Sequence, residues 1–154
     1  MRAFSLVLWI VLCQAVGLVG ARWTAPEIPS WYRTLVRPGF NPPGWIFAPV
    51  WTTLYLLMAI AAWRIGLAAP GSLRTWALGL FLFQLLLNFA WTWIFFHLHA
   101  IRAAFAEIVV LWLVIASTAL VFARMDVPAA ALMLPYLLWV TFAAALNGAI
   151  ARLN

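Results

Sequence analysis

Charged side chains are scarce in this 154-residue sequence: they make up 8% of it, against about 25% in typical soluble domains. Lysine is absent, and the acidic residues are only Glu27, Glu107 and Asp126. Hydrophobic residues make up 68% of the chain, and a water-soluble fold of this size could not bury so much apolar surface. The composition therefore excludes an ordinary soluble domain and indicates a protein whose solvent is lipid.

Residues that hold metals or bind nucleic acids are also few. Cys13 stands alone, which excludes an internal disulfide, and His97 and His99 flank a predicted turn with no neighbouring cysteine or acid in the sequence. The nine arginines lie singly at the ends of apolar runs, which is typical of side chains that reach the membrane interface. We therefore expect no metal site, no required cofactor and no nucleic-acid partner.

Five apolar runs are long enough to cross a bilayer as helices, which takes about 20 residues each. The predicted helices cover residues 3–21, 45–66, 72–96, 102–124 and 128–152. The sequence thus predicts an all-α, multi-pass integral membrane protein, a single bundle of five transmembrane helices surrounded by membrane lipid. A bacterial cell membrane is its expected location.

The first apolar run has a rival interpretation as a signal peptide, because Arg2 precedes it and small residues end it at Ala21. The run is longer than a typical signal-peptide core, and no soluble domain follows it to be exported. We therefore expect a retained helix. The long loop at 22–44 contains five prolines, which argue against a long helix there. Because this loop also carries aromatic residues, we expect it to pack onto the bundle as a lid.

Aromatic and amide residues recur at helical spacing on three of the predicted helices, so each set shares one face. These residues are Trp51 and Tyr55 on the second helix; Gln84, Asn88, Trp91 and Phe95 on the third; and Trp139, Ala143 and Asn147 on the fifth. Alternating helix directions bring the sets together beneath the long loop. For any one residue helix–helix packing is the simpler explanation. The converging set favours a pocket for a flat, largely apolar ligand, with Arg33 and Arg37 placed to meet ligand carboxylates.

Glu107 is the only acidic residue inside a predicted span. Because it lies near a helix start, we expect it to reach the interface and to gain from the helix dipole rather than to relay protons. The sequence contains no Ser/His/Asp set and no phosphate-binding loop, so nothing in it favours hydrolysis or nucleotide chemistry.

Several motifs together resemble the TspO family of tryptophan-rich sensory proteins, bacterial relatives of the mitochondrial translocator protein. The resemblance covers nearly the whole chain. The motif residues are Trp31-Tyr32-Arg33-Thr34-Leu35-Val36-Arg37-Pro38, Pro42-Pro43, Pro49-Val50-Trp51-Thr52-Thr53-Leu54-Tyr55, Gln84, Leu87-Asn88, Ala90-Trp91, Ile94-Phe95-Phe96, Pro135-Tyr136, Trp139 and Leu146-Asn147.

The resemblance implies a five-helix fold, often dimeric, that binds porphyrins such as protoporphyrin IX and drug-like molecules under the first loop. The family's ligand residues correspond to Trp31, Tyr32, Trp51, Asn88, Trp91, Trp139, Ala143 and Leu146. It also implies that light-dependent porphyrin breakdown, which some members carry out, would use Trp51 and Trp139. Four further residues of the convergent stripes complete the predicted ligand site, namely Tyr55, Gln84, Phe95 and Asn147.

Two positions depart from the family pattern. Phe40 replaces a loop tryptophan, and Gly148 stands where the proposed cholesterol motif needs a tyrosine, so specific sterol binding by that motif is not expected. The leading hypothesis is a membrane receptor for tetrapyrroles. A porphyrin-degrading enzyme, a transporter and a packing subunit remain alternatives, although the lack of an inverted repeat argues against a classical carrier. Homodimers are expected through Thr75, Gly79 and Phe83 on the third helix.

Overall fold

The computed structural model describes residues 2–154, and within that range the chain is helical with no strand. Five of its helical segments are long and apolar enough to cross a membrane, as predicted. The elements are α1 (Arg2–Glu27), α2 (Trp31–Thr34), the 3-10 helix η1 (Gly44–Ile46), α3 (Phe47–Gly66), α4 (Ser72–Thr92), the π-helix η2 (Trp93–His97), α5 (Ile101–Ala123) and α6 (Val127–Leu153).

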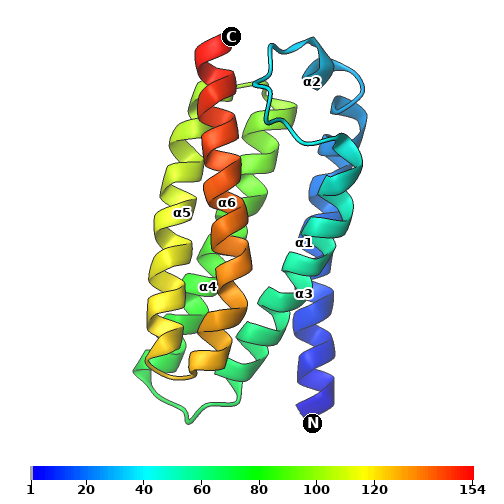
Figure 1. Ribbon diagram of the computed structural model, residues 1–154. Helices are drawn as coiled ribbons and strands as arrows, with labels where there is room; N and C mark the ends of the chain where they lie inside the picture. Colours follow the sequence, from blue (N-terminus) through cyan, green and yellow to red (C-terminus); the bar gives the residue numbers. More distant parts are fainter. Residues whose placement is uncertain (1) are drawn as a thin grey trace.

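The helices run alternately up and down, so α1 begins at one end of the bundle and α6 finishes at the other (Figure 1). In chain order α4 packs on α5 and α5 on α6, while α3 is packed between α1 and α6. The loop with α2 leaves the end of α1, crosses the same end of the bundle towards the end of α6, and returns to α3 (Figure 1). This arrangement puts the loop over the space between α1, α3 and α6.

The predicted boundary of the first helix is wrong. The sequence predicts an end at residue 21 and a loop over 22–44, but α1 continues to Glu27 and contains Pro26 in its last turn. Pro26 removes the one hydrogen bond that its missing N–H would donate to the Arg22 carbonyl, and α1 ends one residue later. The chain also forms α2 within the expected loop, which leaves 35–43 as its extended part. The remaining boundaries agree to within about two residues, as is usual for helix ends.

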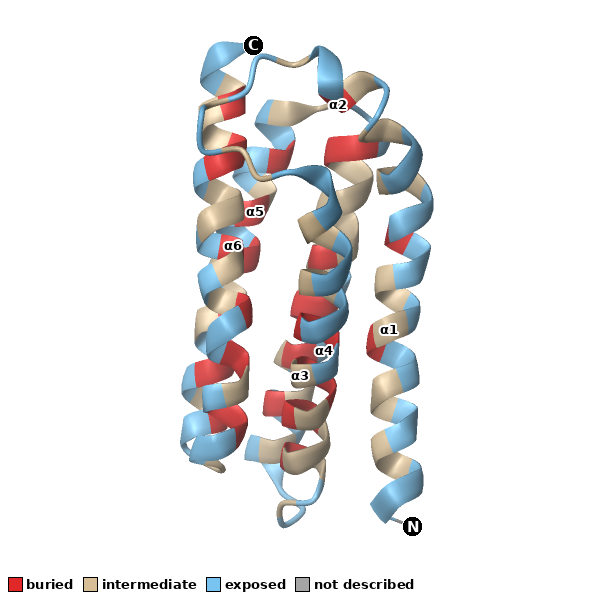
Figure 2. Ribbon diagram, turned by 45° about the vertical axis from the view of Figure 1, so that its right-hand side comes forward, coloured by how far each residue is buried: buried red, intermediate tan, exposed pale blue. Residues whose placement is uncertain are grey.

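Small residues on the inner helix faces let the bundle close tightly. Ala59, Ala62 and Ala77 are fully buried, and a Cβ atom at Gly148 would lie only 2.9 Å from Cε2 of Phe105. Figure 2 shows the buried positions on the faces where helices meet, while α1 is mostly exposed. A larger side chain at Gly148 would have to displace the Phe105 ring on α5.

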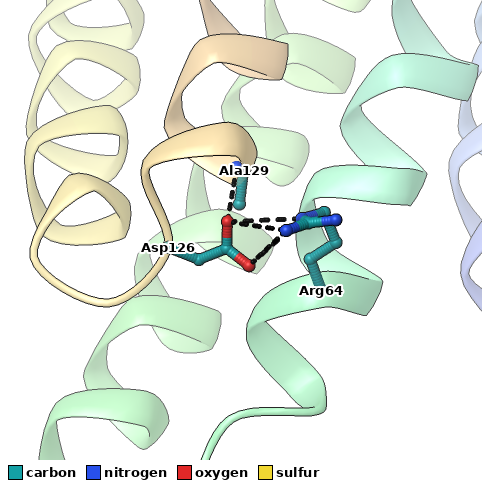
Figure 3. Close-up of polar contacts among 3 residues, drawn as sticks. All are labelled: Arg64, Asp126 and Ala129. Carbon is teal, nitrogen blue, oxygen red and sulfur yellow. Dashed lines mark hydrogen bonds and ion pairs between the residues drawn. The ribbon is translucent and has the colours of Figure 1, made fainter.

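An ion pair closes the end of the bundle opposite α2. Asp126 precedes α6 and accepts a hydrogen bond from the backbone N–H of Ala129 at 3.0 Å, which caps the helix. The Arg64 guanidinium at the end of α3 binds the same carboxylate, with Nη2 3.0 Å from Oδ2 (Figure 3). Partial burial raises the pKa of Asp126, but the hydrogen bonds from Ala129 and Arg64 and the Arg64 charge outweigh this and hold the pKa below its ordinary value.

Candidate ligand site

A cavity of about 300 Å³ lies beneath the loop, between α1, α3, η2 and α6. Its walls are mainly apolar and aromatic, with a few polar groups. The residues that line it are Gln14, Gly17, Leu18, Gly20, Ala21, Thr24, Ala25, Ile28, Tyr32, Gly44, Phe47, Ala48, Trp51, Thr52, Tyr55, Trp91, Thr92, Phe95, Phe96, Trp139, Phe142, Ala143, Leu146, Asn147 and Ile150. Pockets of this size and character are typical of small-molecule sites.

The roof of the cavity is Tyr32 on α2, which is only 5% exposed. Its ring packs near Phe95 and Phe96, its hydroxyl donates to Oδ1 of Asn41, and the Arg37 guanidinium lies 5.4 Å from its ring centre. Burial raises the pKa of the Tyr32 hydroxyl, and the Arg37 charge offsets part of that rise. The expected apolar packing of the loop is therefore confirmed, and Tyr32 is the residue that anchors it.

The loop is also fastened to α6. The backbone N–H of Val36 donates to Oδ1 of Asn154 at 3.0 Å, and Nδ2 of Asn154 donates to the Val36 carbonyl at 2.9 Å. Two hydrogen bonds between one side chain and one backbone unit fix both position and direction. The loop is thus held at its two sides, by Tyr32 over the cavity and by Asn154 beside it.

Trp51 and Trp139 supply the aromatic walls on α3 and α6. Trp51 lies 5.5 Å from Tyr55 between ring centres, and Trp139 lies 6.2 Å from Phe47 and 5.5 Å from Phe142. Both tryptophans are only partly buried, because one side of each ring borders the cavity. Their faces can therefore stack on a flat ligand without a change in the fold.

The π-helix η2 forms the rear wall. The Leu98 N–H bonds the Trp93 carbonyl five residues earlier, instead of four as in an α-helix. Both Phe95 and Phe96 point inwards here and are buried, and Phe95 stacks on Trp91 at 5.1 Å. The wider turn thus brings two consecutive aromatic rings to the site, which is beyond what a regular helix face provides.

Two buried amides join helices around the cavity. Asn88 on α4 accepts from the Tyr55 hydroxyl at 2.6 Å and donates to the Tyr136 hydroxyl at 3.1 Å. Asn147 on α6 accepts from Nε1 of Trp91 at 3.1 Å and donates to the Ile101 carbonyl at 3.0 Å. The hydrogen bonds hold Tyr55 and Trp91 at fixed angles to the cavity, so the amides act as supports for aromatic walls.

The predicted ligand residues mostly come together, but not all reach the cavity. The nine that line it are Tyr32, Trp51, Tyr55, Trp91, Phe95, Trp139, Ala143, Leu146 and Asn147. The other three do not line it: Trp31 stacks on His99 at 4.0 Å, Gln84 contacts the sulfur of Met58, and Asn88 lies behind Tyr55. The spacing placed Gln84 and Asn88 on the correct helix face, but Met58 and Tyr55 fill the space in front of them.

The prediction missed the wall formed by α1. Nε2 of Gln14 donates to the Thr52 carbonyl at 3.0 Å, and Gly17 lets the Tyr55 ring lie against the helix. A Cβ atom at Gly17 would fall 2.5 Å from Cε2 of Tyr55. A signal was present, because Gln14, Gly17, Ala21 and Thr24 recur at helical spacing and are polar or small. Since α1 forms a wall of the cavity, the structure supports the retained helix over a signal peptide.

Three charged side chains lie elsewhere than expected. Neither Arg33 nor Arg37 lines the cavity, since both are exposed on the outer side of the loop. Glu107 does not reach the interface: both of its carboxylate oxygens are buried and have no hydrogen-bond partner. A turn and a half of α5 precedes Glu107, and the surrounding helices cover its carboxyl group. No group of three His, Cys, Asp or Glu side chains that could hold a metal occurs among residues 2–154.

Comparison with known proteins places these features in a family. The sequence pattern of the TspO/MBR family matches residues 9–153. A tryptophan-rich protein TspO from Chlorobaculum tepidum is 43% identical, over 99% of this chain and 98% of that protein. A tryptophan-rich sensory protein from Cereibacter sphaeroides is 38% identical, over 95% of this chain and 89% of that protein. The human translocator protein is 33% identical, over 93% and 86% respectively.

Proposed function

Because the chain belongs to the TspO/MBR family of multi-pass membrane proteins, we propose that it is a membrane receptor for porphyrins and similar flat, largely apolar ligands. The ligand binds in the cavity beneath α2. The observation that carries the proposal is that two partly exposed indole rings, Trp51 and Trp139, line one mainly apolar cavity. Offset stacking on such rings favours a planar aromatic ligand over a flexible lipid chain.

We infer that a ligand enters the cavity from the side of α1 and α3, because exposed residues of both helices line it. Gly17 on α1 lies against the Tyr55 ring on α3, and Ile28, just after α1, lies close to Gly44, in the turn that precedes α3. Between these two contacts, the residues that border the cavity are small and exposed, and they are Ala21, Ala25, Ala48 and Thr52. An apolar ligand dissolved in the bilayer can enter there without crossing water, and its polar edge can remain near the interface. The names of the relatives, sensory protein and translocator protein, fit a receptor that responds to such a ligand or passes it on.

The direct test fills the cavity. Ala143 borders it, whereas Ala145 on the same helix is exposed to lipid. We expect Ala143→Phe to lower the affinity for protoporphyrin IX at least tenfold and Ala145→Phe to leave it unchanged, measured by porphyrin fluorescence with purified protein in lipid nanodiscs. Equal affinity in both variants would place the ligand outside this cavity, and no saturable binding by the native protein would refute the proposal.

Trp51 and Trp139 also favour a second candidate function, the light-dependent breakdown of a bound porphyrin. Both indoles border the cavity and would contact the ring system of a ligand there. Indole rings are readily oxidised, and among residues 2–154 the acid, base or nucleophile groups that line the cavity are only the hydroxyls of Tyr32, Tyr55, Thr24, Thr52 and Thr92. An activity of this kind would need light as its energy source and an external oxidant, such as dioxygen, to accept the electrons.

A further inference from the structure

The loop over the cavity has a third attachment, and this one contains an imidazole. His99 lies in the turn between η2 and α5, and its Nε2 atom is 3.2 Å from Oε2 of Glu27 at the end of α1. The His99 ring also stacks on Trp31, the first residue of α2, with the ring centres 4.0 Å apart and the planes at 14°. One side chain of the turn thus contacts both the end of α1 and the start of α2.

His99 has a backbone conformation that is unfavourable for a residue with a side chain. Its φ is 53°, in the left-handed region, and among residues 2–154 it is the one residue other than glycine with a positive φ. Glycine would form the same turn at a lower cost. Backbone conformations of this kind persist where the surrounding contacts hold them. The contacts of the imidazole with Glu27 and Trp31 can offset the cost.

Trp31 connects this attachment to the cavity through direct contacts. Its ring packs edge-on against Phe95, with the ring centres 5.5 Å apart, and Phe95 lines the cavity. The next residue of α2, Tyr32, forms the roof of the cavity. A movement of Trp31 away from His99 therefore affects a wall and the roof of the cavity together.

Of the three attachments of the loop, only this one contains a group that titrates near neutral pH. The pair of Asn154 and Val36 joins an amide to the backbone, and Tyr32 is held by packing and by its hydroxyl. Imidazole groups change their charge between about pH 5 and pH 8. A protonated His99 has a charge-assisted bond to the Glu27 carboxylate and a cation–π contact with Trp31, whereas a neutral ring has only the weaker forms of both contacts.

Glu27 is the anion that faces His99, and the other charges nearby are positive. Arg102 of α5 lines a hollow together with His99 and with Asn154, the last residue of the sequence. Glu107, the acid of α5, lies further into the bundle with both of its oxygens buried. The remaining charged or titratable side chains on the surrounding elements are exposed, and they are Arg22, Arg33, His97 and Arg152. The arginines oppose a positive charge on His99, whereas Glu27 favours it and is in direct contact.

We propose that Glu27, Trp31 and His99 form a pH-sensitive latch on the loop over the cavity. When His99 is protonated, the latch holds α2 closed, and when His99 is neutral, the latch is weaker and α2 opens more often. Mildly acidic solution therefore slows the exchange of ligand, and the exchange becomes faster as pH rises. The effect on ligand exchange rests on the proposed function, whereas the latch itself does not.

The first experiment measures the opening of α2 in the protein without ligand. Hydrogen–deuterium exchange of the backbone amides of residues 28–36 is compared, in nanodiscs, between the native protein and His99→Asn. Asparagine tolerates the left-handed conformation but removes the imidazole. At about pH 6 the native segment should exchange about two- to fivefold more slowly, the effect of a partly exposed ion pair, and at about pH 8 the difference should shrink.

Comparison of the two proteins at the same pH cancels the effect of pH on the chemical exchange reaction. Equal exchange in both proteins at about pH 6 would overturn the latch, and so would a difference of the same size at about pH 8.

Two further variants test the partners of the contact. Glu27→Gln removes the anion and should remove the pH dependence of the protection. His97→Gln is the matched control, because His97 is an exposed imidazole that forms no ion pair among residues 2–154, and it should behave like the native protein. A pH dependence that persists in Glu27→Gln, or that disappears in His97→Gln, would contradict the assignment to His99.

The second experiment measures ligand exchange. The probe is protoporphyrin IX dimethyl ester, which has no free carboxylates, so that a change with pH reports on the protein. Release from the native protein should be about two- to fivefold slower at about pH 6 than at about pH 8, and release from His99→Asn should be equal at both.

The outcomes separate the latch from the proposed function. Release from the native protein that does not depend on pH, together with the difference in hydrogen exchange, would refute the control of ligand exchange by the latch. If the ester does not bind at either pH while the difference in hydrogen exchange is present, the proposed function fails and the latch stands.

Discussion

The hydroxyl of Tyr55 on α3 donates a 2.6 Å hydrogen bond to Oδ1 of Asn88 on α4, in the interior of the bundle. Tyr55 borders the ligand cavity, and Asn88 lies behind it. This hydrogen bond fixes the orientation of Tyr55 in the cavity wall, although Asn88 itself does not line the cavity. An asparagine that contacts no ligand can therefore still decide the shape of the cavity.

We expect Asn88→Ala to lower the free energy of unfolding by about 1–3 kcal/mol, because the hydroxyls of Tyr55 and Tyr136 lose a buried partner. Thermal unfolding in detergent measures the loss. A double-mutant cycle with Tyr55→Phe isolates the bond between the two residues, and a coupling of about 1 kcal/mol is typical in membranes. Strictly additive effects of the two mutations would show that this bond contributes nothing to stability.

Gly17 should tolerate no side chain. A Cβ atom there would meet the Tyr55 ring at 2.5 Å, and that ring cannot swing away without breaking the bond to Asn88. We expect Gly17→Ala to cost about 1–3 kcal/mol through overpacking and to weaken porphyrin binding. Gly20→Ala is the matched control on the same helix, since its Cβ atom would make an ordinary 3.4 Å contact with Thr92. Similar melting temperatures for the two variants would contradict the close approach of α1 and α3.

The Arg64–Asp126 pair should make stability depend on pH in the acidic range. The pKa of Asp126 is lower in the folded protein than in the unfolded chain, so its stabilisation is complete above the unfolded pKa and is lost as pH falls through the folded pKa. We expect the melting temperature of the native protein to fall from about pH 5 to about pH 2. Asp126→Asn should keep the helix cap and lose part of this slope. An unchanged slope in Asp126→Asn would assign the acid sensitivity to another group.

Sequence reasoning predicted the five spans because hydropathy and length determine them in lipid, where the backbone must satisfy its own hydrogen bonds. It also predicted that Trp51, Trp139 and Asn147 lie at one cavity, because helical spacing and the alternating direction of the helices determine which helix faces meet. It could not predict that Tyr55 screens Asn88, since that depends on how far one side chain reaches past another. The sequence prediction ends α1 too early, because the helix continues through Pro26 at the cost of one backbone hydrogen bond and stops one residue later.

Glu107 shows a different limit of sequence reasoning. Its distance along the chain from Arg102 indicated a group near the interface, and nothing in the sequence shows how neighbouring helices cover a carboxyl group. Burial of its oxygens follows from the close packing of α4 and α6 against α5, which small residues such as Ala104 permit. Whether a charged side chain in a membrane span is buried or reaches the interface therefore depends more on the packing of neighbouring helices than on its position along its own helix.

Homodimers remain a prediction, with α4 as the interface. Thr75, Gly79 and Phe83 are all exposed on one side of α4, and a Cβ atom at Gly79 would meet nothing within 4 Å in the single chain. A second helix can approach closely at such a glycine. We expect Gly79→Leu to reduce the yield of crosslinked dimer in membranes, while Leu138→Ala on the exposed face of α6 leaves the yield unchanged. Equal dimer yields in both variants would exclude this face.

The last prediction concerns the two cavity tryptophans under light. If a bound porphyrin is photo-oxidised with their help, illumination of the native complex should give a new absorbing product, and Trp51→Phe or Trp139→Phe should abolish most of it. Phenylalanine keeps an aromatic wall but is far harder to oxidise. The substitutions should therefore lower the affinity for the porphyrin by less than tenfold, while the absorbing product disappears. Trp112→Phe is the matched control, because that indole donates to Thr141 outside the cavity and should leave the product unchanged. A product that forms equally in all three variants would arise from the porphyrin alone and would leave the receptor function as the sole role of the site.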